Sequence, residues 1–383
     1  MSFIESKLDR FTMYQVMFGV LGSLVLVSVL LSLFGQISYS LNELVVSLVV
    51  LLGVSVAAHL VCKQLWGAPA NLDSTLITGL ILFFVFSPST DWWEVMLLGG
   101  VAMVAILSKY VISYRQVHIF NPVALAAVVA ALSGLTFATW WMATPYMLPV
   151  VAVGGALIAI KLRRSAMVLT CLVVSLLFMA GMTMVAGNFS PSLLLIFILS
   201  SPIVFYITVM VTEPLTTPGT KKLQYAYAVF IGVVGSVPFV FGPVFNSPEL
   251  TLILANLVFF GFTLRQRLTL VLKEKREIAE GILECTFTPS RPLRFKAGQY
   301  LEWTLPHKKS DGRGIRRYFT IASAPEDEEV TLAVRLSDEG SSFKGKLQDL
   351  DVGGKIFATA RGGDFVLPRQ KKAKLLWIAG GIG

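Results

Sequence analysis

The stretch from Glu249 to Glu280 reads ELTLILANLVFFGFTLRQRLTLVLKEKREIAE, and the chain changes character inside it. Between Glu249 and Arg265 no residue is charged, and the run is apolar enough for the interior of a lipid bilayer. From Arg265 onward charged residues return and continue to the end of the sequence. The stretch therefore joins two parts of the chain that suit two different solvents.

The composition of the whole chain supports this division. Of 383 residues, 55% are hydrophobic and 14% are charged, and the mean hydropathy is +0.72. Soluble globular chains average about 25% charged residues, so a wholly soluble protein and a disordered one are both excluded. Only eight Lys and Arg residues occur from Met13 to Leu264, whereas 22 occur from Arg265 onward, together with 15 Asp and Glu. The net charge of +9 then needs no nucleic-acid partner.

Ten apolar stretches of the first part approach the ~20 residues that a membrane-spanning helix needs. They are residues 12–34, 43–62, 74–90, 94–112, 122–139, 145–160, 165–186, 192–212, 225–242 and 249–264. We therefore expect residues 1–265 to form a polytopic membrane domain, an all-α bundle of about ten transmembrane helices. Lipid is then the first partner of this chain.

The basic residues predict how this bundle is oriented. If the N-terminus lies inside, all eight basic residues fall in inner loops, and the outer loops contain neither Lys nor Arg. This is the positive-inside pattern. Tryptophans 92, 93, 140 and 141 lie at the predicted outer boundary, where indole rings prefer the interface. We expect a multi-pass protein of a bacterial-type cytoplasmic (inner) membrane, with its N-terminus and its charged C-terminal part in the cytoplasm.

The charged part has the pattern of a small β protein. We expect a linker over 266–280, because charge is dense there, and an antiparallel β-barrel with one helix over 281–373. The expected strands are 281–289, 298–305, 316–323, 329–336 and 355–360, and the expected helix is 342–350. We expect residues 374–383 to form an apolar strand that runs into a glycine-rich turn, which is how a nucleotide-binding unit begins. We expect this unit to be an NAD(P)-binding domain that continues beyond the sequence.

Several motifs follow one another in order over residues 295–383. They are Phe295-Lys-Ala-Gly-Gln-Tyr300, Arg317-Tyr-Phe-Thr-Ile-Ala-Ser-Ala324, Gly340-Ser-Ser-Phe343, Gly363-Asp-Phe365 and Ile378-Ala-Gly-Gly-Ile-Gly383. Together they resemble the flavin domain of ferredoxin–NADP reductases, over about residues 274–383. The resemblance implies FAD as the cofactor and an FAD-dependent NAD(P)H oxidoreductase as the enzyme class.

The family's Arg-x-aromatic-hydroxyl motif falls here on Arg317, Phe319 and Thr320. A guanidinium can grip the diphosphate of FAD with two parallel hydrogen bonds, and an aromatic ring stacks on the isoalloxazine. A hydroxyl near the flavin N5 tunes hydride acceptance, so the resemblance gives catalytic roles to Thr320 and Phe319. The family usually has Tyr at the position of Phe319, and core packing is the alternative role for this ring. Tyr318 should point to the opposite face of the strand.

Two further groups complete the predicted cofactor site. Ser341 and Ser342 begin the expected helix, where free amides bind phosphate, although simple helix capping is the alternative. Gly380, Gly381 and Gly383 match the start of the family's nicotinamide-binding half, which implies NAD(P)H as donor. The choice between NADH and NADPH stays open.

The membrane part carries its own motifs. Residues 73–79 (DSTLITG) with 116–122 (QVHIFNP), and residues 212–218 (TEPLTTP) with 223–228 (LQYAYA), resemble two related membrane proteins. These are the RnfD protein of the Rnf complex and the NqrB protein of the sodium-pumping NADH:quinone oxidoreductase, Nqr. The chain thus resembles a fusion of an RnfD/NqrB-like domain with a flavin domain. The resemblance implies two inverted five-helix halves, an arrangement that places sites near the midplane.

That family carries a flavin, FMN or riboflavin, in its membrane domain, and links it covalently through threonine. This chain departs from the motif and offers only Ser133-Gly-Leu-Thr136, so Thr136 is a weak candidate and a small-residue helix contact is its alternative role. Asn121 is the other candidate, because with Pro122 it starts a helix whose end can face an anion. A second flavin is therefore a further expected cofactor.

Other redox groups and ion relays find little support in the sequence. The three histidines cannot supply the paired ligands of stacked haems, so we expect no haem, and three scattered cysteines give no metal-site spacing. None of the expected helices has a charged residue near its middle, where ion relays usually have carboxylates.

Taken together, these residues predict a membrane flavin oxidoreductase. It would move electrons from NAD(P)H through FAD to a membrane or outer-face acceptor: quinone, a membrane flavin or a partner subunit of an electron-transport system. The alternative is a non-redox membrane carrier or scaffold whose flavin domain serves sensing or docking.

Overall fold

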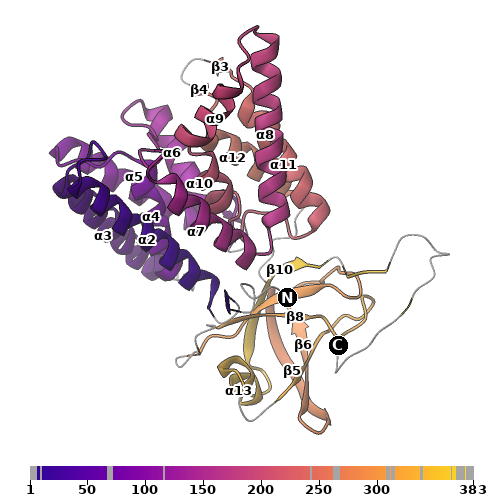
Figure 1. Cartoon of the computed structure of the whole chain (residues 1–383). Coiled ribbons are helices and arrows are strands. Elements are labelled where there is room, and N and C mark those ends of the chain that lie inside the picture. The colour runs from indigo at the N-terminus through magenta and orange to yellow at the C-terminus, as the bar shows by residue number, and fades with distance from the viewer. Residues whose placement is uncertain are drawn as a thin grey trace. The chain divides into compact units, whose positions relative to one another are not determined.

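The computed structural model divides the chain into two compact units (Figure 1). The helical unit comprises Met1–Pro218 and Lys222–Phe262, and the sheet unit comprises Gly219–Lys221 and Thr263–Gly383. The structure describes residues 7–8, 11–66, 72–114, 117–241, 244–261, 268–307, 311, 315–336, 340–363, 365–367 and 376.

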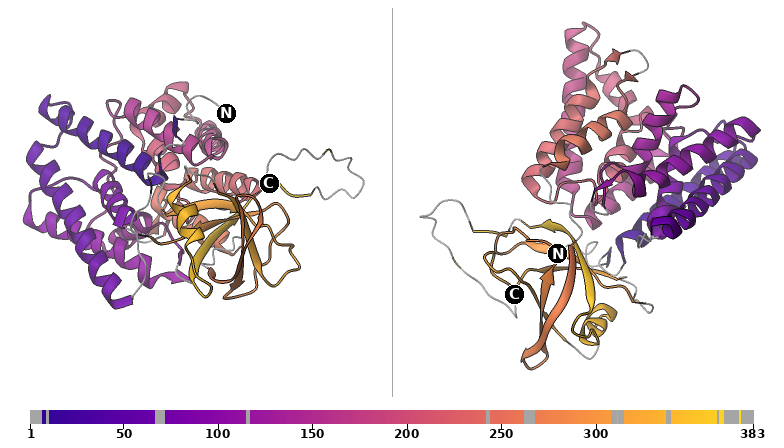
Figure 2. Two further views of the ribbon diagram at one scale, coloured as in Figure 1. Left: turned by 90° about the horizontal axis from the view of Figure 1, so that it is seen from below. Right: turned by 180° about the vertical axis from the view of Figure 1, so that it is seen from behind.

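The helical unit begins with α2 (Met13–Leu33), α3 (Leu41–Trp66), α4 (Leu72–Val85), α5 (Trp92–Val111) and α6 (Pro122–Ser133). It continues with α7 (Leu148–Lys161), α8 (Ser165–Val185), α9 (Pro191–Ser200), α10 (Ile203–Phe205), the π-helix η1 (Tyr206–Met210), α11 (Lys221–Ser236) and α12 (Pro248–Phe260). Each predicted apolar stretch coincides with one of these helices, and the eighth coincides with α9, α10 and η1 together. In Figures 1 and 2, α3 packs against α4 and α5, while α2 packs against α7.

Four helices are long and apolar enough to cross a membrane: α2, α3, α5 and α8. The pair α9 and α10–η1 meets the same criteria together but is bent by 65°. The apolar helices α4, α6, α7 and α12 have only 12 to 14 residues. At 1.5 Å per residue they extend about 20 Å, less than a bilayer core of about 30 Å. Within the described residues there are thus four or five candidate spans, fewer than the ten expected.

The eighth predicted stretch, 192–212, is broken and not continuous. Pro202 has no backbone N–H to donate, and α9 ends at Ser200 just before it. After the break the chain winds into η1, whose residues are all buried. Wider π turns of this kind are rare in helices and often accompany functional sites.

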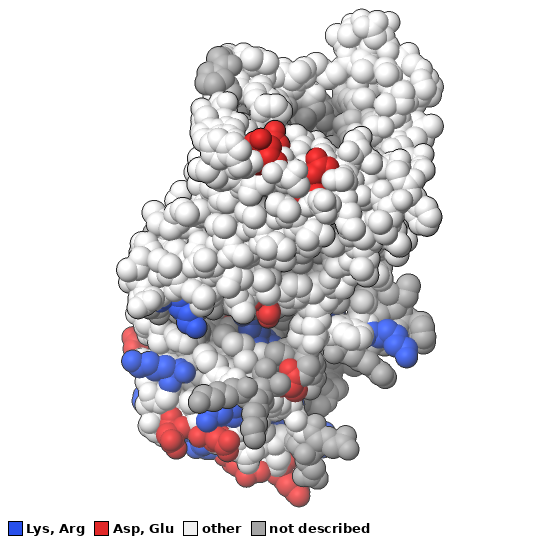
Figure 3. Space-filling view, turned by 90° about the vertical axis from the view of Figure 1, so that its left-hand side faces the viewer, with Lys and Arg blue, Asp and Glu red and all other residues white. Residues whose placement is uncertain are grey.

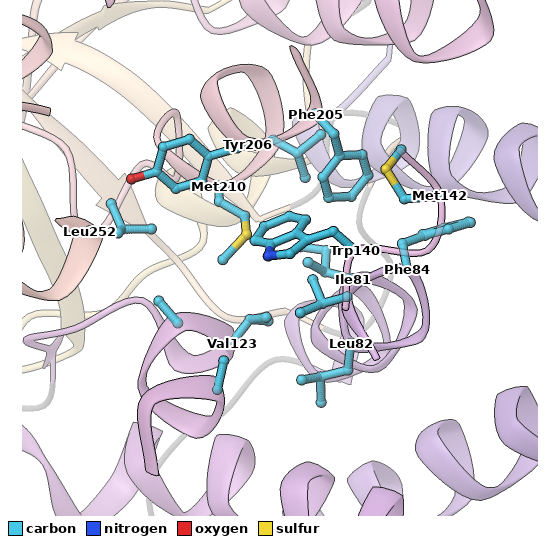
Figure 4. Packing of buried hydrophobic residues seen from close by; sticks show 14 of the residues in the cluster. Ile81, Leu82, Phe84, Val123, Trp140, Met142, Phe205, Tyr206, Met210 and Leu252 are labelled. Atoms are coloured by element: carbon cyan, nitrogen blue, oxygen red, sulfur yellow. The ribbon is translucent and has the colours of Figure 1, made fainter. Parts of the chain in front are cut away.

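The core of the helical unit lies around Trp140, shown in Figure 4 among Phe205, Tyr206 and Met210. The ring of Trp140 meets those of Phe205 and Tyr206 edge-on, at centroid distances of 6.3 and 6.2 Å. Trp140 is therefore a core residue and so is its neighbour Trp141, so neither ring faces outward, and their depth in a membrane stays a prediction. Tryptophans 92 and 93 are exposed, as the expected place at the membrane boundary requires.

The described surface of the helical unit includes many large apolar side chains. On the face shown in Figure 3 it consists almost entirely of uncharged residues, with a few acidic side chains near one end, whereas charges of both signs are interspersed over the sheet unit. Large aliphatic side chains such as Leu26, Val49 and Leu65 are more than half exposed. Exposed aliphatic side chains on long apolar helices suit contact with lipid.

The sheet unit contains β5 (Leu268–Ala279), β6 (Ile282–Pro289), β7 (Tyr300–Thr304), β8 (Arg316–Thr320), β9 (Val330–Arg335) and β10 (Lys355–Gly362), with α13 (Ser342–Gln348). The strand order is β8-β7-β10-β5-β6-β9, and every neighbouring pair is antiparallel. The predicted strands and the predicted helix are therefore present.

The expected linker over 266–280 is wrong, because this stretch contains β5, a central strand of the sheet. Leu268, Leu270 and Leu272 alternate into the core. The charges that suggested a linker lie on the exposed half of the strand, where Arg276 pairs with Glu284 of β6 at 2.7 Å. The expected start of an NAD(P)-binding domain, 374–383, lies outside the described residues except for Leu376.

Candidate functional site

β8 positions two of the predicted FAD-binding residues on one face. Its register with β7 sets Arg317 opposite Trp303 and Phe319 opposite Leu301. Directly opposed residues of an antiparallel pair project to the same side, and Trp303 and Leu301 are buried in the core. Arg317 and Phe319 therefore share the inner face of β8.

Arg317 is held by an acidic partner. Its Nη2 donates to both carboxylate oxygens of Asp311, at 2.8 and 2.9 Å, and its Nη1 donates to the backbone oxygen of Arg316 at 2.7 Å. The guanidinium also lies 5.9 Å from the centre of the Phe343 ring of α13. The side chain of Arg317 is only 12% exposed, so its direction is fixed by these contacts.

The two serines at the start of α13 have different roles. Ser341 Oγ accepts from the backbone N–H of Lys344, so Ser341 caps the helix, which was the alternative role. Ser342 instead contacts the partner of Arg317: its N–H donates to Asp311 Oδ2 at 3.0 Å, and its Oγ accepts from the Asp311 N–H at 2.8 Å. His307 Nε2 lies 3.0 Å from the same Oγ.

The aromatic residue of the motif, Phe319, and its hydroxyl residue, Thr320, lie on opposite faces of β8. Phe319 is half-buried against the sheet core and meets Phe343 at a ring distance of 5.6 Å. Thr320 and Tyr318 are exposed on the other face, where Tyr318 meets Tyr300 edge-on at 5.5 Å. The opposite direction of Tyr318 is therefore confirmed. Phe319 lies beside Arg317, but Thr320 does not share their face.

Two more of the quoted motifs lie side by side. Gln299 Nε2 donates to the backbone oxygen of Gly363 at 3.4 Å. Gly298 has a φ of +87°, and a Cβ at this position would lie 1.8 Å from the backbone oxygen of Phe365. Only glycine tolerates both that dihedral and that approach. Gly298 and Gln299 therefore meet Phe365 and Gly363 through contacts that depend on the motifs' own residues.

The donor set around Arg317 fits a flavin dinucleotide. The guanidinium of Arg317 and the N–H and hydroxyl of Ser342 supply hydrogen-bond donors for a diphosphate, and the half-buried ring of Phe319 supplies apolar surface for a ring system. Asp311 and His307 also belong to this group, although the motifs did not predict them. No local pattern in the sequence indicates that Asp311 and His307 contact Ser342.

This geometry does not test the predicted nicotinamide residues. Gly380, Gly381 and Gly383 lie outside the described residues. Their role stays a prediction.

In the helical unit, a buried polar cluster joins the two resemblance motifs. It consists of His118, Asn121, Glu213 and Thr216. Glu213 Oε1 contacts His118 Nε2 at 2.9 Å, and Oε2 accepts from Asn121 Nδ2 at 2.9 Å and from Thr216 Oγ1 at 3.0 Å. The cluster therefore brings the QVHIFNP and TEPLTTP segments together. Glu213 was not predicted as a site residue from the sequence. The search for buried carboxylates considered the middles of the expected helices, and Glu213 directly follows the expected helix 192–212.

Asn121 also fixes the start of α6. Its Oδ1 accepts from the N–H groups of residues 123 and 124, and its own N–H donates to Asn256 Oδ1 at 2.9 Å. Thr136 follows Gly134, the C-cap at the opposite end of this 12-residue helix. The two ends are about 18 Å apart, so the structure does not bring the two candidate membrane-flavin residues together.

Comparisons with known proteins bear on a segment of the chain. No protein-family model matches the chain. A stretch of 121 residues is 35% identical to the reductase subunit of an aromatic O-demethylase from Amycolatopsis sp.. The match covers 30% of this chain and 35% of that relative. The chain is 34% identical over 94 residues to DmpP, the reductase component of a phenol 2-monooxygenase from Pseudomonas sp., covering 24% and 25%. Among solved structures, the Amycolatopsis cytochrome P450 reductase GcoB covers 29% of this chain and 33% of its own, with 32% identity and a TM-score of 0.25.

A segment of this chain is similar to reductase components. The chain spans about a third or less of the length of the curated relatives it matches. The prediction of a ferredoxin reductase-type segment is confirmed at this level, and the relatives' names agree with the expected enzyme class. The resemblance of the helical unit to RnfD and NqrB gains no support from these matches and stays a prediction.

Proposed function

We propose that this chain is a membrane flavoprotein that takes electrons from NAD(P)H through FAD in the sheet unit. The electrons would pass to an acceptor in the membrane or at its outer face, such as quinone, a second flavin or a partner subunit. The observation that carries the proposal is the group of Arg317, Ser342 and Phe319, whose chemistry suits FAD. The matched 121 residues are also close in length to Thr263–Gly383, the main part of the sheet unit.

In the proposed site, each side chain acts through a contact that its position allows. Arg317 would bind the diphosphate through its two terminal nitrogens, and Ser342 would add its hydroxyl and its N–H. Phe319 would orient the cofactor and exclude water, supported from behind by the buried ring of Phe343. Thr320 lies on the other face of β8, so the proposed site assigns it no contact with the cofactor. FAD, when bound, supplies the ability to take a hydride from a nicotinamide and to release electrons singly.

Two finer features of the fold belong to this proposal. A backbone hydrogen bond of 2.9 Å from Ala322 to Thr331 links the segment after β8 to β9, the opposite end of the strand order, which supports closure into a barrel. In the helical unit, α6 and α12 each follow a two-stranded hairpin and each begin with proline after a capping residue, Asn121 or Ser247. This repetition supports two related halves. We propose that they form about ten spans in a cytoplasmic membrane, in line with the apolar stretches and the basic loops of the sequence.

The test is electron delivery across a vesicle membrane. The purified full chain is reconstituted with FAD into lipid vesicles that enclose ferricyanide, and NADH, NADPH or dithionite is added outside. Dithionite needs no nicotinamide site, so it tests the membrane step independently of the donor. We expect the enclosed ferricyanide to be reduced faster than in protein-free vesicles, and slowly with the Arg317→Ala variant.

The scaffold alternative predicts a different result. If the chain holds one flavin, lost on deleting 274–383, and the enclosed ferricyanide is reduced no faster than in empty vesicles, the helical unit is not an electron path. A second flavin that survives the deletion, in contrast, supports the redox proposal and a membrane carrier.

A further inference from the structure

Asp311 occupies the groups that the proposed cofactor needs. One of its carboxylate oxygens accepts from both Arg317 Nη2 and the Ser342 N–H, and the other accepts from the same Arg317 nitrogen. Its own N–H is bonded to Ser342 Oγ. A carboxylate and a phosphate present similar oxygens to a guanidinium, so Asp311 satisfies the same donors that a diphosphate would use.

The contact is a substantial one for an ion pair at the surface of a protein. The side chains of Arg317 and Asp311 are 12% and 28% exposed, so water screens them only in part. Two anions cannot share the same guanidinium nitrogen at hydrogen-bonding distance without repelling each other. A diphosphate that binds Arg317 must therefore displace the Asp311 carboxylate or accept its repulsion.

We propose that Asp311 is an internal competitor of FAD: its carboxylate neutralises Arg317 and Ser342 in the cofactor-free chain and lowers the affinity for the diphosphate. This inference rests on the proposed function, because it presumes that Arg317 binds FAD. It assigns to Asp311 a role that the flavin motifs do not contain. The Asp311 carboxylate therefore raises the stability of the chain without FAD and lowers its affinity for FAD.

The test compares charge-removing variants of the full chain. Asp311→Asn keeps the shape of the side chain, and Asp311→Ala removes the carboxylate entirely. Asp351→Asn is the matched control, because Asp351 is an exposed acid of the same unit whose removal changes the net charge equally. FAD affinity is measured by quenching of flavin fluorescence, and the melting temperature is measured without cofactor and with inorganic diphosphate.

Removal of the Asp311 carboxylate should have two opposite effects. We expect both Asp311 variants to melt lower than the wild type without cofactor, and to bind FAD about 3- to 10-fold more tightly, the range that corresponds to a partly exposed ion pair. Inorganic diphosphate should raise their melting temperatures more than it raises that of Asp351→Asn.

Two other outcomes overturn the inference and are distinguishable. If the wild type binds FAD but both Asp311 variants bind it no more tightly than Asp351→Asn, Asp311 is not a competitor and the proposed function stands. If neither the wild type nor any variant binds FAD, the proposed function fails and the inference fails with it.

Discussion

Glu213 and Asn121 are 92 positions apart in the chain and are joined by a hydrogen bond of 2.9 Å between Glu213 Oε2 and Asn121 Nδ2. The same carboxylate holds His118 and Thr216. It therefore ties the start of α6 to the segment that follows η1. This junction therefore gathers three side-chain contacts on one acidic residue.

Replacing Glu213 should destabilise the helical unit. Glu213→Ala leaves the buried polar groups of Asn121 and His118 without their acceptor, which we expect to lower the free energy of unfolding by about 2–4 kcal/mol. Thermal unfolding of the full chain in detergent measures the effect. The control is Glu94→Ala, at an exposed position of α5. Equal melting temperatures for the two variants would show that the cluster contributes nothing.

The close packing of α7 against η1 at Gly155 predicts that a larger residue there destabilises the helical unit. A Cβ at Gly155 would lie 2.4 Å from Thr208 Oγ1 of η1, whereas a Cβ at Gly100 of α5 would meet no atom within 4 Å. Gly155→Ala should therefore cost about 1–3 kcal/mol, and Gly100→Ala should be neutral or stabilise by up to about 1 kcal/mol. Melting of the two variants side by side checks this. A neutral Gly155→Ala would mean that α7 and η1 pack less closely than described.

The same comparison is available in the sheet unit. Gly298→Ala places a side chain against the backbone of Phe365 at a positive φ, while Gly345→Ala, within α13, meets open space. We expect Gly298→Ala to lower the melting temperature and to weaken FAD binding, because it separates two flavin motifs. Gly345→Ala should do neither. If both variants behave as the wild type, the contact between the motifs is not required.

The thiol of Cys285 predicts a dependence of stability on pH. Burial in β6 raises the pKa of Cys285 to about 11, above the value near 8.5 of a free thiol. Because the folded chain favours the neutral thiol, its contribution to stability is complete below about pH 8.5 and is lost as the pH rises toward 11. Urea unfolding of the full chain at pH 8 and pH 10 should show a larger loss of stability for the wild type than for Cys285→Ala. Equal losses would remove Cys285 as the cause.

Much of the helical pattern can be predicted from the sequence, because apolar runs and proline or capping residues mark helices locally. Thr12 with Gln15 and Asn121 with Pro122 show this at the starts of α2 and α6. The break at Pro202 was also visible locally, but the long apolar run around it concealed the interruption.

The errors arise where distant contacts decide the structure. Charge over 273–280 resembles a linker until β6 and β10 pair with β5 and turn its charges outward. In the site, Arg317 follows from a motif, but its contact with Asp311 and the bond between Asp311 and Ser342 depend on how separate segments meet. The same holds for Glu213, whose partners come from another part of the chain.

The binding of FAD by the purified full chain is the most direct test of the proposed function. Flavin absorbance and fluorescence titration are measured for the wild type, for Arg317→Ala and for Arg276→Ala, an exposed arginine of the same sheet. We predict one FAD bound in the sheet unit, an affinity at least tenfold lower for Arg317→Ala, as expected for the loss of a charged hydrogen-bonding partner, and no change for Arg276→Ala. A colourless wild type, or an Arg317→Ala variant with unchanged affinity, would contradict the assignment.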